Sequence, residues 1–137
     1  MELNLPKVAA FLCCNNIQQD VLSKNYEIRG VFQGFNPPTY PFGVEFITFT
    51  RLFHDQAGEF QIDISLFNEK GEKTVDSAPR KIAFGDIPMH DLITAWRVVF
   101  PAAGVYTFKV FCNNLNVSEY KIFCRQSPPM PAPPGSF

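Results

Sequence analysis

The sequence lacks the features that mark nucleic-acid-binding, membrane and exported proteins. Its 12 Lys and Arg residues are scattered and nearly balanced by 13 acids, so no basic block can neutralise a phosphate backbone, and we expect no nucleic-acid partner. No apolar run is long enough to cross a bilayer. The start carries Glu2 and only a short apolar run at 8–14, which is not a signal peptide. We therefore expect no membrane partner and a cytoplasmic location.

Histidine and cysteine are too few, or wrongly spaced, for common metal sites. Two histidines exclude a three-His zinc site, and the four cysteines form no C-x-x-C pair. We expect no metal and no other cofactor. The thiols are expected to be reduced and half-buried, and Cys13 and Cys14 should point to opposite faces of one strand.

Catalytic motifs are missing as well. The two His-Asp dipeptides, at 54–55 and 90–91, lack the helical setting and further ligands of a metal phosphohydrolase. The loop carboxylates stand singly, whereas calcium needs six or more oxygens together. No G-x-S-x-G occurs, and the glycine before Lys73-Thr74 lacks phosphate-loop spacing. We predict that the protein is not an enzyme.

Aromatic and alternating strands are what the sequence does contain. It has 15 Phe, and residues 59–67 alternate apolar and polar side chains between two turn signals. The same style recurs along the chain, and Trp96 is expected in the core. Strands are predicted at 7–15, 26–32, 44–53, 59–67, 92–100, 106–112 and 117–124, with a further short edge strand at 80–84. About seven strands and no long helix predict an immunoglobulin-like antiparallel β-sandwich over residues 1–125.

The segment 97–113 predicts a corner between two sheets. Pro101 ends one strand because it has no N–H to donate, and Gly104 allows the turn. The next strand starts inward at Tyr106, whose hydroxyl is expected to bond to nearby backbone.

The last hairpin can be predicted to its register. A loop of about three residues, 113–115, places Phe108 opposite Tyr120 and Lys109 opposite Glu119. Cys112 and Cys124 then lie too far apart for a disulfide.

Several segments together resemble a known family. They are F-L-C-C-N-N-I-Q-Q-D, K-N-Y-E-I-R-G-V-F, the loop end Y-P-F, F-N-E-K-G-E and F-P-A-A-G-V-Y-T-F-K-V. Over residues 7–125 the chain is similar to small bacterial proteins grouped as a domain of unknown function with a single β-sandwich. The resemblance implies the fold and a bacterial source, and it brings no activity and no functional residue.

Two segments are candidate partner-binding sites. The loop 30–43 holds four rings among three prolines, and these rings either bind a partner or cap one end of the sandwich. The proline-rich tail, 126–137, contains Pro128 and Pro131 after Arg125, a pattern read by aromatic grooves, or it is a passive tail. The candidate rings are Phe32, Phe35, Tyr40 and Phe42.

The sequence thus predicts a non-catalytic module that binds a protein partner or associates with itself. The contact would use an edge strand or the 30–43 loop. The alternative is a small-molecule or carbohydrate-binding sandwich, which needs a concave site with converging polar groups.

Overall fold

The computed structural model describes residues 4–128, and in this part of the chain every regular element is a β-strand. The prediction of an all-β protein is confirmed. The strands are β1 (Lys7–Cys14), β2 (Asn16–Gln19), β3 (Tyr26–Arg29), β4 (Gly34–Phe35), β5 (Phe42–Phe53), β6 (Gly58–Phe67), β7 (Lys73–Asp76), β8 (Arg80–Phe84), β9 (Met89–Phe100), β10 (Gly104–Cys112) and β11 (Leu115–Cys124).

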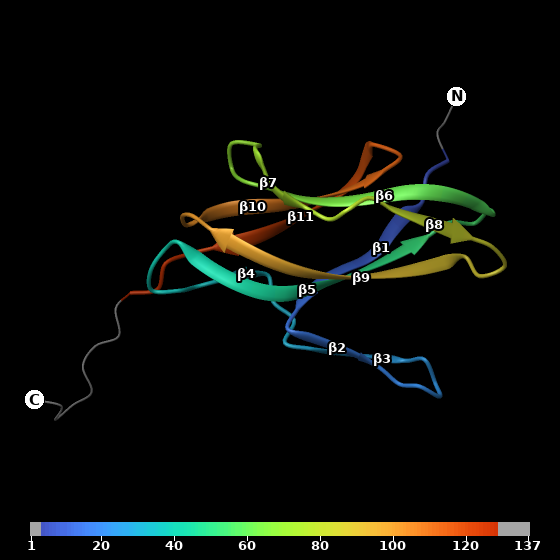
Figure 1. Ribbon diagram of the computed structural model, residues 1–137, viewed down its shortest axis with the longest axis horizontal. Coiled ribbons are helices and arrows are strands. Elements are labelled where there is room, and N and C mark those ends of the chain that lie inside the picture. Colours follow the sequence, from blue (N-terminus) through green and yellow to red (C-terminus); the bar gives the residue numbers. More distant parts are fainter. Residues whose placement is uncertain (1–3, 129–137) are drawn as a thin grey trace, which may run out of the picture.

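Two sheets pack face to face as a sandwich (Figure 1). One has the order β1-β5-β9, and the other has the order β4-β11-β10-β6-β7, with β8 also paired to β6. Residues 4–128 form eleven strands rather than about seven. The strands that the sequence did not predict, β2, β4 and β7, have only two to four residues and little apolar alternation. The immunoglobulin-like type of sandwich stays a prediction.

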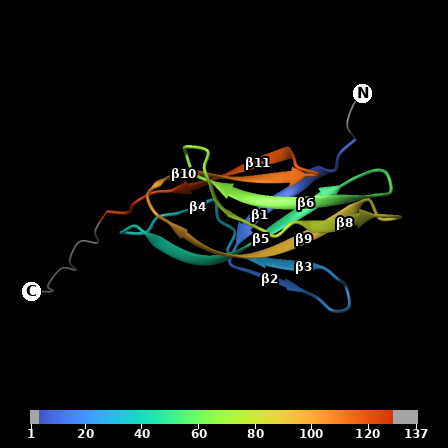
Figure 2. The same cartoon turned by 45° about the horizontal axis from the view of Figure 1, so that its top comes forward.

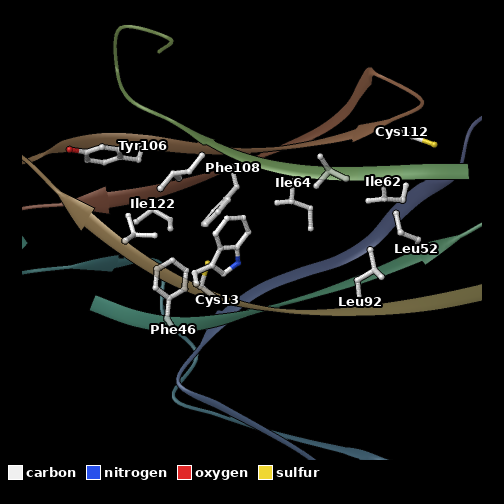
Figure 3. Packing of buried hydrophobic residues seen from close by; sticks show 14 of the residues in the cluster. Cys13, Phe46, Leu52, Ile62, Ile64, Leu92, Tyr106, Phe108, Cys112 and Ile122 are labelled. Atoms are coloured by element: carbon white, nitrogen blue, oxygen red, sulfur yellow. The ribbon is translucent and has the colours of Figure 1, made fainter. Parts of the chain in front are cut away.

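The core lies between the two sheets. Figure 3 shows Phe46 and Leu92 of the three-stranded sheet pointing toward Phe108 and Ile64 of the other. Trp96 is in this core, as predicted, with 4% of its surface exposed. Its indole Nε1 donates a hydrogen bond of 2.8 Å to Thr48 Oγ1, which satisfies the one polar atom of the ring.

The predicted corner and hairpin register are both confirmed. The Tyr106 hydroxyl donates to the Ala102 carbonyl at 2.8 Å, and the chain passes there from β9 to β10 in the other sheet. Phe108 lies opposite Tyr120, and Lys109 lies opposite Glu119. The loop, however, has two residues, 113 and 114, both with positive φ. Leu115, predicted in the loop, instead pairs with Cys112, and a β-bulge leaves Val117 of β11 unpaired, so that the register beyond Val110 is kept.

The strand predicted at 26–32 ends early, at Arg29. Gly30 has φ +68°, and a Cβ there would stand 2.3 Å from Asn15 Nδ2, so this turn requires glycine. The hairpin of β2 and β3 therefore leaves the sandwich and lies outside the three-stranded sheet (Figure 2). Its Tyr26 ring packs on Phe49, with ring centroids 5.3 Å apart.

Candidate interaction surface

Among the described residues, β9 is the longest strand that lies at the edge of a sheet. This strand has twelve residues, and β5 pairs with it along its whole length. Within residues 4–128 no strand pairs with the opposite edge of β9. A long unpaired edge presents a row of backbone donors and acceptors to which another strand can add.

The backbone groups of alternate β9 residues face this edge. Arg80 Nη1 donates to the Ile93 carbonyl at 3.3 Å. The backbone carbonyl of Ile93 therefore points away from β5, toward the free edge. In an antiparallel strand the N–H and C=O of one residue point to the same side, and that side alternates. The groups of Ala95, Arg97 and Val99 therefore face outward too, and they are the ones available to a partner.

The side chains of these residues lie on the outer face of the three-stranded sheet, and most are apolar. Val99 is 62% exposed, Met89 45% and Ile93 42%, and Phe53 of β5 adds a ring that is 40% exposed beside Met89. The β2–β3 hairpin covers Phe49, the next ring in β5, but not the β9 side of the face. An apolar strip therefore runs along the free edge.

Two ion pairs interrupt the strip. Arg51 of β5 holds Asp91 of β9 with two hydrogen bonds of 2.8 and 3.0 Å, and this partner raises the pKa of the Arg51 guanidinium. Toward the other end of β9, Arg97 contacts Glu45 at 2.7 Å, and both side chains are largely exposed. The edge strand thus carries one acid and one base at separate positions, and each faces a charge of opposite sign on β5.

A shallow hollow of about 460 Å³ lies beside the strip, between the base of the β2–β3 hairpin and the β5–β9 pair. The hollow widens the accessible surface next to the edge. Its lining comprises Asn15, Glu45, Phe46, Ile47, Ala95, Trp96 and Arg97.

The predicted ring cluster of the 30–43 loop packs on the core. Phe35 lies within 5.8 Å of four rings by centroid distance, those of Phe32, Phe42, Phe46 and Phe100. Tyr40 donates its hydroxyl to the Arg125 carbonyl at 2.6 Å. These contacts are those of a cap on one end of the sandwich, and partner binding by the four rings stays a prediction.

The start of the predicted tail runs beside this loop. The N–H groups of residues 123, 125 and 127 donate to the carbonyls of residues 33, 35 and 37, at 2.9, 2.9 and 3.0 Å. Gln126 adds a side-chain bond to Pro38 O at 2.9 Å. Pro128 is exposed, and Pro131 lies outside the described residues.

The histidines of the two His-Asp pairs lie near the strand ends. His54 is buried, its Nδ1 accepts from the Gln56 N–H at 3.0 Å, and its Nε2 lies 3.1 Å from Asn4 O. His90 lies near Phe84 at one end of β9. Over residues 4–128 no three His, Cys, Asp or Glu side chains gather as a metal site would require. The same residues include no helix that could span a bilayer.

All four cysteines are buried free thiols. Burial raises the pKa of Cys13 to about 12, with a smaller contribution from neighbouring Cys14, and raises that of Cys124 to about 11. These thiols are held protonated and act as apolar side chains.

The sequence predicts contact through an edge strand, but it does not identify β9 as that strand. The alternation of Ile93, Ala95, Arg97 and Val99 is visible in the sequence, yet it predicts only which face these side chains share. Whether a strand lies at an edge depends on the order of strands in the sheet, which alternation does not encode.

Comparison with known proteins gives a family and no activity. Residues 9–125 match DUF6941, a family of unknown function, and the chain belongs to it. No curated protein matches the chain. Among solved structures, two crystal structures of a glycosyl hydrolase family 2 member from Bacteroides cellulosilyticus match 60% of this chain at 10% identity and a TM-score of 0.47. The matched part spans 12% of that longer chain.

Proposed function

We propose that this member of DUF6941 is a non-catalytic protein-interaction module that binds an extended strand at the free edge of β9. The observation that carries the proposal is the length of that edge: along the twelve residues of β9, no strand of the described part of the chain forms a backbone ladder with it. A partner strand added there gains main-chain hydrogen bonds for affinity, and its side chains gain contacts on both faces.

The apolar strip supports the same role. An exposed apolar row beside unpaired backbone groups is unfavourable for an isolated sandwich, because it invites association. The outer face of the second sheet is mixed in character, since Lys109 and Glu119 pair at 3.7 Å, Lys121 is exposed and Phe123 is 39% exposed. The long unpaired edge, rather than the outer face alone, is therefore what suits the β9 side to strand addition.

The cellular setting is part of the proposal. Four buried free thiols are suited to a reducing compartment, which supports a cytoplasmic location. The family's bacterial source also stays an expectation.

The test uses a photo-crosslinking amino acid in place of Val99, in the full chain expressed in its native cells. Val99 is exposed beside the free edge, so irradiation should give a protein adduct resolved by mass. The matched control carries the same residue in place of Lys121, which is exposed on the outer face of the other sheet. Adducts at Val99 and not at Lys121 support the proposal, whereas none at Val99, or equal yields at both sites, would overturn it.

A further inference from the structure

We propose that the strand that pairs with β9 is β9 of a second copy of this chain, antiparallel, with Thr94 facing Thr94 across a two-fold axis. This inference rests on the proposed function and names its partner. It follows from the pattern of charge and apolarity along the edge strand, which is complementary to itself in this one register.

The geometry limits the possible registers. Opposite residues in a hydrogen-bonded antiparallel pair must both present their backbone groups to the shared edge, and their side chains lie on the same face. Only residues with outward N–H and C=O can therefore be opposite one another in hydrogen-bonded pairs. With Thr94 on the axis these pairs are Met89–Val99, Asp91–Arg97 and Ile93–Ala95, each occurring twice.

The charged pair is the first argument for this register. Asp91 would lie opposite Arg97 of the second copy, and β5 already places Arg51 beside Asp91 and Glu45 beside Arg97. Across the joined sheets the row would read Arg51, Asp91, Arg97 of the second copy, and its Glu45. Charges of alternating sign in directly opposed positions stabilise strand pairing.

The apolar residues match in the same register. Ile93 would lie opposite Ala95, in a row that continues to Phe49 and Leu12 in one copy and to Ile47 and Cys14 in the other. Met89 would lie opposite Val99, and these two are among the most exposed apolar side chains of the molecule, at 45% and 62%. Pairing would therefore bury apolar surface against apolar surface.

The neighbouring registers lack this match. A shift by one pair in either direction places Arg97 opposite Ile93 or Met89, and Asp91 opposite Val99 or Ala95. Larger shifts reach Arg97 opposite Arg97, or Asp91 opposite Asp91, which are repulsive. Among the antiparallel registers of β9 with itself, only the one centred on Thr94 sets the acid against the base.

Strand β8 fits the same symmetry. Strand β8 begins at Arg80, whose guanidinium donates a hydrogen bond to the Thr94 hydroxyl. It ends at Phe84, whose ring centroid lies 6.4 Å from that of His90. Thus β8 covers the Met89 half of β9 from the other sheet. In a two-fold pair, β8 of the second copy would lie over the opposite half, so the two β8 strands occupy separate places.

Arg80 opposes this pairing. Its guanidinium donates to the Ile93 carbonyl and to the Thr94 hydroxyl, at the centre of the edge, and the two copies of Arg80 would meet near the axis. Charged side chains on edge strands weaken unwanted pairing. Arg80 therefore limits the affinity of the pair, and the Arg80→Ala protein is the form in which association is strongest.

The chain's own C-terminal residues are unsuited to this edge. Residues 129–137 contain four prolines, each without the N–H that strand pairing needs. A second β9, by contrast, supplies all its outward N–H groups, since none is a proline.

The first experiment is a charge swap read by sedimentation velocity, with Arg80→Ala as the common background. Asp91→Arg and Arg97→Glu should each weaken self-association about tenfold or more, because each alone sets like charges opposite one another. A mixture of the two variants should associate again, because position 91 of each variant then faces a charge of opposite sign at position 97 of the other. Circular dichroism of each variant checks folding, and a mixture no tighter than its components overturns the register.

The second experiment does not depend on the charges. Thr94→Cys would bring two Cα atoms within about 4.5 Å across the axis, close enough for a disulfide, whereas Ala95→Cys would leave them roughly 8 Å apart or more. In the full chain under mild oxidation, we expect a disulfide dimer from Thr94→Cys only. A dimer from Ala95→Cys alone indicates the neighbouring register and overturns this one.

The two proposals can fail separately. If Val99 crosslinks only to other proteins and the Arg80→Ala chain stays monomeric at millimolar concentration, the β9 edge is an interaction site and the self-pairing is wrong. If Val99 crosslinks to nothing and the chain stays monomeric, both proposals fail.

Discussion

Phe35 offers the sharpest test of whether the 30–43 loop is structural. The Phe35→Ala change removes a ring with four aromatic neighbours at 4.7 to 5.8 Å. Deleting a fully buried Phe lowers the free energy of unfolding by about 3–5 kcal/mol, so about 3 kcal/mol is expected for this half-buried ring. That corresponds to a fall of about 10 °C in the thermal midpoint.

Urea unfolding followed by Trp96 fluorescence measures this change, since Trp96 is 4% exposed in the folded chain. The matched control is Phe123→Ala, the same deletion on a ring that is 39% exposed, for which we expect a smaller loss of about 1–2 kcal/mol. Equal losses of unfolding free energy in the two variants would refute the interpretation that the 30–43 loop caps the core. A stable Phe35→Ala protein that no longer binds a partner would instead make the loop a binding surface.

Three further predictions concern single groups. Thr48→Val leaves the buried Trp96 indole N–H without an acceptor and should lower the free energy of unfolding by about 2 kcal/mol in urea titrations; an unchanged midpoint would contradict this. Because the pKa of Cys13 rises from 9.0 to about 12 on folding, its thiol stabilises the fold fully below pH 9, and this contribution is lost as pH rises to about 12. Urea midpoints should fall over that range in reducing buffer, and less steeply for Cys13→Ala; parallel curves would refute the assignment. Arg80→Ala should tighten self-association about 30-fold, because each copy no longer has to break a hydrogen bond to the Ile93 carbonyl that contributes about 1 kcal/mol. If equilibrium sedimentation shows no gain in affinity, Arg80 does not compete for the edge.

Local patterns predicted much of the fold. Alternation identified β6 and the inward row of β10, and the pairing of Lys109 with Glu119 selected the correct register of the last hairpin. The predicted length of the loop in this hairpin was wrong. A two-residue turn followed by a bulge gives the same pairs beyond the bulge as a three-residue loop, so side-chain matching does not distinguish them. Register therefore follows from side-chain matching even where the turn geometry does not.

Features that depend on strand order could not be predicted. The hairpin of β2 and β3 leaves the sandwich at Gly30, and nothing in the flanking residues distinguishes such a turn from an ordinary one. The candidate interaction surface is similar in this respect. Its residues read as a half-buried strand, and only the position of β9 at the end of its sheet makes that strand a binding edge.

The ladder that ties residues 123–127 to residues 33–37 has a mechanical consequence. The described ends of the chain lie at opposite ends of the sandwich (Figure 1), so tension between them would run along the strands. The two segments are parallel, and Gly34 lets them approach closely, since a Cβ there would stand 2.0 Å from Phe123 O. Tension at the C-terminal end would load the three N–H to carbonyl bonds together, in shear, rather than opening them one after another. We therefore expect this end of the sandwich to resist tension better than a ladder whose bonds open in sequence.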